Sequence, residues 1–301
     1  MPHCVMMKEK TLVLLAAGKG SRFGGLKQLH RFQPQNATLS EYAIWDALQA
    51  GFDHFVAIVS EETQEEFYRI FKDMGVGDRS CCVLQNNTEN ICRSKPWGTG
   101  HALYVARNSI HTPFIIANGD DFYGREAFYQ AAEFLENNPK DFALVGYPLG
   151  GTLSPNGYVS RALCYTQKDC IYQLQECTQI ELSSEGTILG YENAHAKVLD
   201  PQQWVSMNFW VLQPSVLPYL EKQWSLFLDQ LQEPEKEEFY LPTAIQAIAQ
   251  QNNISIRLLK NEKGSWQGIT YAKDTDSVQQ NILAWTHEHR YPSSFQSKKT
   301  F

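Results

Sequence analysis

The 301-residue sequence lacks several features that would assign it to a specialised class of protein. Its seven cysteines include no CxxC pair, and their odd number argues against a disulfide framework. No apolar run approaches the ~20 residues of a membrane span. Acidic residues outnumber basic ones, giving a net charge of -7, whereas a general nucleic-acid-binding protein normally carries a basic stripe. These absences predict a cytoplasmic protein with reduced thiols and with neither nucleic-acid nor membrane partners.

The composition is typical of one large folded unit. Apolar residues make up 43% of the chain and aromatic residues 12%, so long disordered stretches are not expected. The chain has no repeat of fixed period and no linker rich in Pro or Ser. We therefore expect a single domain over residues 1–301, in which the pattern of strands and helices changes near residue 140. The sequence leaves a homo-oligomer open.

The first half alternates buried-looking strands with helices. Strands are expected near 11–18, 54–60, 81–87 and 113–121, and helices near 39–51, 61–75 and 98–110, with Ser40 as an N-cap. This alternation predicts an α/β fold with a Rossmann-like, doubly wound and mostly parallel sheet. The second half predicts a mixed extension of the same sheet, with strands near 141–149, 158–166, 170–177, 206–214 and 254–260 and helices within 214–250.

Three polar segments follow strands of the predicted sheet. They are the glycine-rich stretch after residue 17, the region of Gln85, and the turn from Asn118 to Asp121. In doubly wound sheets, ligands bind beyond the carboxyl ends of the strands. We therefore expect these three segments to meet at one edge of the sheet.

The stretch LLAAGKGSRFGGLKQ, residues 14–28, combines a buried strand with bare backbone and positive charge. Gly18, Gly20, Gly24 and Gly25 allow backbone N–H groups to approach a ligand closely, and Ser21, Arg22 and Lys27 add a hydroxyl and two cations. Such a loop suits a polyphosphate, although it is neither a P-loop nor a clean GxGxxG motif. Glycines alone would indicate only a tight turn.

The turn ANGDDFYG places two carboxylates after a buried strand. Paired carboxylates at a strand end can hold Mg²⁺, a hard ion that prefers oxygen ligands and shares phosphate oxygens. The alternative is an ordinary Asp-rich turn. With a phosphate-binding loop on the same edge, we favour a magnesium site at this turn.

These motifs together resemble the sugar-phosphate nucleotidylyltransferases, or NDP-sugar pyrophosphorylases. LAAGKGSRFGGLKQL is similar to their G-x-G-T/S-R…P-K signature, with Leu26 in place of the Pro. LQNN…KPWGTGHAL resembles their base-recognition segment, in wording closest to the uridylyltransferases, and ANGDDFYG resembles their metal-binding G-D turn. The resemblance implies a nucleotide-binding half over 1–140 and a sugar- or acceptor-binding half over 141–301.

The resemblance also implies roles for individual residues. Arg22 and Lys27 become catalytic cations, and Asp120 becomes the metal ligand, with Asp121 in contact with the sugar or supporting the metal site. Gln85 and Gly98 offer a side-chain amide and bare backbone that match a base edge. The nucleotide-binding residues implied in this way are Ala16, Ala17, Gly18, Gly20, Ser21, Gln85, Gly98 and Thr99.

The second half resembles the family less closely. Its G-Y, E-K and N-x-G-I segments match SPNGYVSRA, LQEC and VSMNFWVL, which implies acceptor contacts from Gly157, Glu176, Asn208 and Trp210. Cys177 stands where many members have Lys, and Trp210 where they have Gly. Gly268 stands where a second metal-binding Asp is expected, and either Asp274 or Asp276 could replace it.

The resemblance implies a Mg²⁺-dependent enzyme that joins an NTP, with UTP favoured, to a sugar-1-phosphate and releases pyrophosphate. Small molecules are its expected partners. A phosphocholine cytidylyltransferase is the first alternative, because Trp210 could pack on a methylated ammonium. The second is a catalytically silent sensor of nucleotide-sugars, which the missing late Asp keeps open.

Overall fold

The computed structural model of the chain describes residues 9–18, 26–86, 93–262, 264–269 and 271–295. The helices are α1 (Leu39–Gln49), α2 (Glu61–Asp73), α3 (Thr99–Ala106), α4 (Arg125–Asn137), α5 (Val216–Gln230), α6 (Leu241–Asn252) and α7 (Asp274–His287). The strands are β1 (Thr11–Ala16), β2 (His54–Val59), β3 (Ser80–Leu84), β4 (Phe114–Asn118), β5 (Asp121–Phe122), β6 (Phe142–Pro148), β7 (Val159–Gln167), β8 (Cys170–Leu182), β9 (Ile188–Glu192), β10 (His195–Leu199), β11 (Trp204–Leu212), β12 (Ile256–Lys260) and β13 (Gln267–Gly268).

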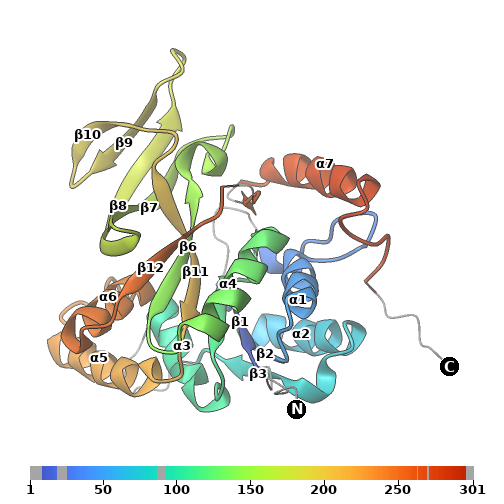
Figure 1. Cartoon of the computed structure of the whole chain (residues 1–301), viewed down its shortest axis with the longest axis horizontal. Helices are drawn as coiled ribbons and strands as arrows, with labels where there is room; N and C mark the ends of the chain where they lie inside the picture. The colour runs from blue at the N-terminus through green and yellow to red at the C-terminus, as the bar shows by residue number, and fades with distance from the viewer. Residues whose placement is uncertain (1–8, 19–25, 87–92, 263, 270, 296–301) are drawn as a thin grey trace, which may run out of the picture.

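An 11-stranded sheet runs through the molecule in the order β10-β9-β8-β12-β6-β11-β4-β1-β2-β3, with β7 paired to both β11 and β8 (Figure 1). Strands β3, β2, β1 and β4 are parallel to one another. Val13 of β1, for example, pairs with Val56 on one side and Ile116 on the other. Because these four strands are parallel, their carboxyl ends meet at one edge, as the sequence predicts.

The α/β class and the mixed C-terminal extension agree with the prediction, but parallel pairing is less extensive than expected. Strand β11 lies antiparallel to all three strands with which it pairs, β4, β6 and β7, and so interrupts the parallel order. Beyond it only β12 and β6 are parallel. The sheet as a whole is therefore mixed rather than mostly parallel.

Five strands of the C-terminal half close on themselves. The hydrogen-bonded order β8-β12-β6-β11-β7 returns to β8, because β7 pairs with β11 at one side and with β8 at the other. This closure curves β7 and β8 away from the plane of the parallel strands. Figure 1 shows β8, β9 and β10 projecting from the body of the sheet.

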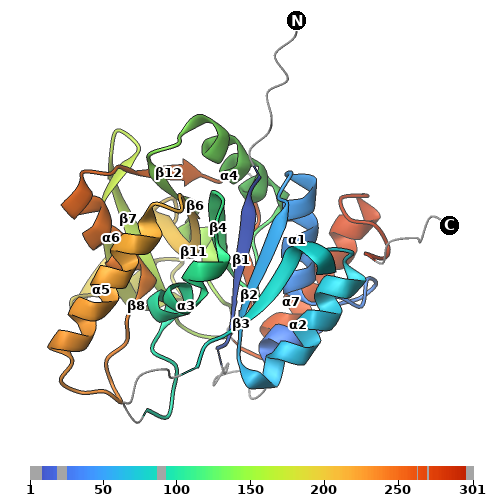
Figure 2. The same ribbon diagram turned by 90° about the horizontal axis from the view of Figure 1, so that it is seen from below.

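Helices cover both faces of the sheet because its buried strands are apolar on both sides. Alternate residues of β1 belong to different cores: Leu12 and Leu14 pack in one, Val13 in the other. The first core includes apolar residues of α1, α2, α4 and α7, and the second those of α3, α5 and α6. Figure 2 shows α1 and α2 on one side of β1–β3 and α3 and α5 on the other. In the described part of the chain, no helix has the length and apolar character needed to cross a membrane.

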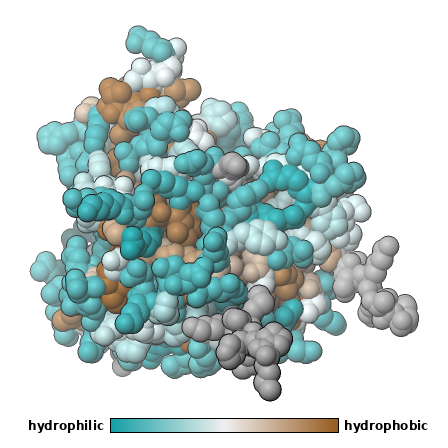
Figure 3. All heavy atoms as spheres, viewed as in Figure 1, coloured by the Kyte–Doolittle hydropathy of each residue, from teal (hydrophilic) through white to brown (hydrophobic). Residues whose placement is uncertain are grey.

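Several elements have no counterpart in the sequence-based prediction: α4, α7, β9 and β10. Strand β10 is exposed over most of its length and depends on its pairing with β9. Leu182, Leu189 and Val198 are exposed on these projecting strands, and apolar surface gathers there in Figure 3.

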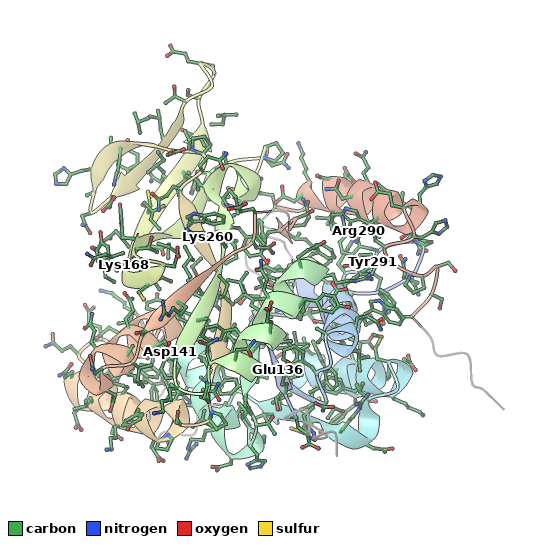
Figure 4. All side chains as sticks on the ribbon, viewed as in Figure 1. Glu136, Asp141, Lys168, Lys260, Arg290 and Tyr291 are labelled. Atoms are coloured by element: carbon green, nitrogen blue, oxygen red, sulfur yellow. The ribbon has the colours of Figure 1, made fainter. Side chains whose placement is uncertain are left out.

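The segment after α7 fastens the C-terminal end of the fold to α1 and α4. The Tyr291 hydroxyl donates to Asp46 Oδ2 at 2.7 Å, and Arg290 forms an ion pair with Glu126 at 3.2 Å. Burial raises the pKa of Asp46 to about 7, although Tyr291 and Arg125 oppose the shift. Figure 4 shows Arg290 and Tyr291 beneath α7 and beside α1.

The N-cap of helix α1 lies two residues before the Ser40 cap predicted from the sequence. Thr38 is the N-cap: its hydroxyl accepts from the Glu41 N–H at 3.3 Å, and the Glu41 carboxylate accepts from the Thr38 N–H at 2.8 Å. This capping box pairs the Thr38 N–H and gives the Glu41 N–H a side-chain acceptor at the helix start. Ser40 instead donates to the Gly119 carbonyl at 2.7 Å.

We expect Thr38→Ala to lower the free energy of unfolding by about 1–2 kcal/mol, because it removes a buried N-cap. Urea unfolding followed by circular dichroism measures the change. Ser225→Ala is the control, since Ser225 is exposed within α5 and its loss is expected to change stability by less than about 0.5 kcal/mol. Equal effects of the two substitutions would contradict the assignment of the cap.

Candidate active site

The three polar segments predicted to meet at the sheet edge do lie together, around a cavity of about 820 Å³. The cavity extends from the ends of β1 and β4 to β7, β8 and β11 of the closed ring. The sequence-predicted residues that line it are Ala16, Ala17, Gly18, Lys27, Gln85, Gly98, Thr99, Asp120, Asp121, Glu176 and Asn208. Gly20, Ser21 and Arg22 lie outside the described residues.

Gly18, the first glycine of the glycine-rich stretch, is held by a side chain that the sequence analysis did not predict to be part of the site. Gln28 is buried, and its Nε2 donates to the Gly18 carbonyl. Gln28 lies in the short 3₁₀ helix Lys27–Leu29, so the same turn that fixes Gly18 also positions Lys27. Position 28 is adjacent to the basic motif, but nothing in its residue type indicates a contact ten residues away.

Lys27 and Asp120, which both line the cavity, form an ion pair. The Lys27 ammonium also donates to the Ile269 carbonyl at 3.4 Å. Asp120 follows Gly119, where an added Cβ would lie 3.0 Å from Ser40 Oγ and 3.2 Å from the Leu15 carbonyl. A bare backbone at position 119 therefore allows the acidic turn to pack against β1 and places its carboxylate beside the lysine.

Asp121 is nearly fully buried and is held by a chain of side-chain amides. Asn118 Nδ2 donates to Asp121 Oδ2 at 2.8 Å, and Asn208 Nδ2 donates to Asn118 Oδ1 at 2.9 Å. The Trp210 indole N–H donates to Asn208 Oδ1 at 3.1 Å. Burial raises the pKa of Asp121, and the neighbouring Asp120 raises it further, against the opposing effect of Lys27.

Asn208 reaches this chain because of a local irregularity in β11. Its φ is 61°, in the left-handed region, and the pairing of β11 with β6 shifts register between Ser206 and Trp210. The Asn208 N–H donates to Ser206 Oγ at 3.1 Å. A bulge of this kind redirects a side chain at the expense of backbone strain, and here it turns the Asn208 amide toward Asn118.

Two predicted acceptor residues do not reach the cavity. Trp210 is fully buried in the core beneath β11, so it can influence a ligand only through Asn208. Gly157 has a φ of 153°, and an added Cβ would lie 2.7 Å from the Tyr271 hydroxyl. Gly157 lies in the connection that precedes β7, and its bare backbone packs closely against Tyr271.

The structure also shows which groups surround Gly268, the position where a second metal-binding Asp was expected. Gly268 pairs directly with Asp121, and an added Cβ would lie 3.0 Å from Asp121 Oδ1 and 2.3 Å from the Trp266 ring. The space of a side chain at position 268 is thus filled by Trp266 and Asp121. Asp274 and Asp276 do not line the cavity; Asp274 accepts from Ser154 and Asn156 at 2.9 and 2.7 Å.

At the opposite end of the cavity, Gln85 and Gly98 lie side by side. Gln85 Nε2 donates to the Gly98 carbonyl at 2.9 Å and lies 3.4 Å from His101 Nδ1. Gly98 has a φ of 100°, and an added Cβ would lie 2.9 Å from the Phe239 carbonyl. His101 is completely buried, with its ring centroid 4.7 Å from that of Trp224.

The part of the cavity formed by β7 and β8 contains a cation that the prediction missed. Arg161 of β7 lines the cavity together with Glu176 of β8, and its guanidinium lies over the Trp266 ring at 4.9 Å. Burial lowers the pKa of Arg161 to about 10, so the side chain remains a cation at neutral pH. Cys177 is buried beside it and does not line the cavity. Arg161 falls within the SPNGYVSRA segment, but its role depends on partners distant in sequence.

Comparison with known proteins agrees with this architecture. The family model of the MobA-like NTP transferase domain matches residues 12–182. The inositol-1-phosphate CTP transferase of T. maritima has a similar structure, with a TM-score of 0.65 at 16% sequence identity, covering 92% of this chain and 96% of that chain. A protein of Bacillus anthracis assigned as a glucose-1-phosphate thymidylyltransferase, in complex with sucrose, gives 0.61 at 10% identity, covering 90% and 94%. The comparison with curated proteins found no match. The structural likenesses show a shared nucleotide-diphospho-sugar transferase fold.

The burial of His101 predicts a pH dependence of stability. Burial lowers the pKa of His101 to about 4, and the Arg93 guanidinium contributes to the shift, whereas an unfolded chain has a His pKa of about 6.5. The unfolded state therefore binds the proton first as the pH falls. Stability from this group should decline between about pH 6.5 and pH 4, by about 3 kcal/mol in total.

His101→Asn isolates this contribution, because it retains an acceptor near the Nδ1 position and removes the titration. Urea unfolding at several pH values should show a stability difference between wild type and variant that shifts against the wild type below pH 6.5. Asp46 and Asp121 titrate in both proteins and cancel in the difference. A difference that does not vary with pH would show that the pKa of His101 is the same in the folded and unfolded states, and would contradict the effect of burial.

Proposed function

Because the chain belongs to the MobA-like NTP transferase family, we propose that it joins an NTP to a sugar-1-phosphate and releases pyrophosphate. The observation that carries this proposal is the meeting of Lys27 and Asp120 in the wall of one large cavity. The same cavity is lined by Gly18 and Gly98 and by polar residues of β7, β8 and β11 in the closed ring. The arrangement suits transfer between two phosphate-bearing substrates.

The nucleotide occupies the end formed by β1, β3 and the start of α3. The Gln85 side chain and the bare Gly98 backbone contact the base edge, and the Gly18 end of the glycine-rich stretch lies toward the phosphates. UTP is the favoured nucleotide, on the wording of the GTGHA segment. The two structural neighbours are described with CTP and thymidylyl chemistry, which supports a pyrimidine base.

A divalent cation fits the acidic turn. Mg²⁺ is usually held by one or two carboxylates together with substrate phosphates, and Asp120 and Asp121 provide two carboxylates at the cavity. Among the described residues there is no cluster of three or more His, Cys, Asp or Glu side chains that could hold a metal, so phosphate oxygens would complete the coordination. When bound, Mg²⁺ would neutralise charge on those oxygens.

The proposed step is an in-line displacement at the α-phosphorus. An oxygen of the acceptor phosphate forms a bond to the α-phosphorus, and the bond from phosphorus to the bridging oxygen of pyrophosphate breaks. The side chains hold the reactants and neutralise charge, as in other phosphoryl-type transfers. Lys27 would stabilise charge on the α-phosphate, and Arg22 would hold the β- and γ-phosphates that leave.

The aromatic side chains of the cavity favour a hydroxylated acceptor over phosphocholine. A trimethylammonium group binds over an aromatic face. Trp210 is completely buried, and the Trp266 face is already covered by the Arg161 guanidinium. Among the described lining residues this leaves Tyr240 as an aromatic surface, while Glu176 and Asn208 supply polar groups suited to hydroxyls.

We expect pyrophosphate release to be fastest with UTP and a hexose-1-phosphate, and to require Mg²⁺. An enzyme-coupled assay would combine UTP, CTP, dTTP, ATP and GTP with glucose-1-phosphate, N-acetylglucosamine-1-phosphate, inositol-1-phosphate and phosphocholine. Chelation with EDTA should abolish release, and added Mg²⁺ should restore it.

Other outcomes of the assay identify the alternatives. If pyrophosphate is released only from CTP with phosphocholine, the acceptor is phosphocholine rather than a sugar-1-phosphate. If calorimetry detects binding of nucleotide-sugars but no pyrophosphate is released, the protein is a sensor. Absence of both release and nucleotide binding would overturn the proposed function.

Lys27→Ala should lower kcat by about 10²–10³, if the ammonium stabilises charge that develops in the transition state. The KM for the nucleotide should change much less, because that role is confined to the reacting phosphate. Steady-state kinetics of pyrophosphate release give both constants. Lys72→Ala is the matched control, since Lys72 is exposed on α2, away from the cavity. An unchanged kcat in Lys27→Ala would remove Lys27 from the mechanism.

A further inference from the structure

Arg161 is a buried cation whose hydrogen-bonding capacity is only partly used. One terminal nitrogen donates to the Ser160 carbonyl at 2.8 Å and the other to the Thr152 carbonyl at 2.5 Å. A guanidinium has five N–H donors, so these contacts satisfy two. Its Nε is buried and has no hydrogen-bond partner among the described residues.

No carboxylate of the described residues lies within 4.0 Å of the Arg161 guanidinium. Asp121, Glu176 and Asp274 act on it only through longer-range attraction, while burial opposes its charge. A buried charge without a close counter-ion is costly, and such a site is completed when an anion enters it. An anionic group in the acceptor end of the cavity would supply the counter-charge and the hydrogen-bond acceptors that the Arg161 guanidinium lacks.

The position of Arg161 indicates which anion this is. Its neighbour Ala162 pairs with Glu176 across β7 and β8, and both Arg161 and Glu176 line the cavity. On the other side, Arg161 is close enough to lower the pKa of Asp121. Arg161 therefore lies between the polar sugar end and the acidic turn, where the acceptor phosphate must sit to reach the nucleotide.

We infer that Arg161 binds the phosphate of the acceptor substrate and selects phosphorylated over unphosphorylated acceptors; this inference rests on the proposed function. Trp266 holds the guanidinium plane from one side, and the Thr152 and Ser160 carbonyls fix its orientation. The remaining N–H donors match phosphate oxygens, which planar guanidinium groups bind as paired acceptors.

Arg161 also ties β7 to the connection that contains Thr152, so a purely structural role must be distinguished. A structural tie would affect all ligands equally, whereas a phosphate contact affects only those that carry the phosphate. Binding of glucose-1-phosphate and inositol-1-phosphate, compared with glucose and inositol, separates the two roles in wild type and in Arg161→Gln.

We expect Arg161→Gln to reduce the preference for the phosphorylated over the free compound by about 10- to 100-fold, the range of one charge-assisted contact. Calorimetry on the full chain measures the four affinities. Arg161→Lys keeps the charge but loses the planar fork, and it should retain more of the preference. Arg257→Gln is the matched control, because Arg257 lies on β12 in an ion pair with Asp141 and does not line this cavity.

The inference is overturned if the preference survives in Arg161→Gln, if wild type shows no preference, or if free and phosphorylated compounds weaken equally. Thermal unfolding tests each variant for folding, and Arg161→Lys carries the comparison if Arg161→Gln does not fold. Titration with UTP and CTP is a separate readout. If nucleotides bind but phosphorylated acceptors are not preferred, only the role of Arg161 is contradicted. If the wild-type protein binds no nucleotide, the proposed function is contradicted.

Discussion

The buried carboxylate of Asp121 is the constraint on which the geometry of the cavity depends. A carboxylate removed from water must receive hydrogen bonds, since its desolvation is otherwise uncompensated. Asn118 supplies one at 2.8 Å and is itself held by Asn208 at 2.9 Å. Asn208 reaches that position only through the left-handed residue and register shift in β11. The irregular strand and the acidic turn after β4 are therefore coupled, and the carboxylates are fixed by two central strands rather than by a loop alone.

The N-terminal architecture was accessible from the sequence because buried parallel strands leave continuous apolar runs. β1, β2 and β4 all follow that pattern, and the match of residues 12–182 to the NTP transferase family confirms the resemblance read from the motifs. Strand β10 could not be read in the same way: it is exposed and depends on pairing with β9, a contact that leaves no local apolar pattern. The antiparallel direction of β11 between β4 and β6 could not be predicted either, because it depends on the path of the whole chain and not on a local pattern.

The candidate site likewise contains residues that could be predicted from the sequence and residues that could not. Gly98 and Asp120 do line the cavity, because the start of α3 and the turn after β4 both lie at the same edge of the sheet. Trp210 was expected in the acceptor pocket, but the bulge at Asn208 changes which residues of β11 face each side. Arg161 was overlooked because its environment is created by Thr152 and Trp266, which the fold brings together from opposite directions.

The glycine at position 268 has a consequence for how this chain can change over evolutionary time. Its missing side chain is replaced by the Trp266 indole, whose ring carbons lie 2.3 Å from where a Cβ would stand. A single substitution that introduced aspartate would collide with that ring, and the ring also supports the guanidinium of Arg161. Positions 266 and 268 are thus sterically coupled: an aspartate at position 268 can be accommodated only if the Trp266 ring moves, and that movement would withdraw the ring from the Arg161 guanidinium.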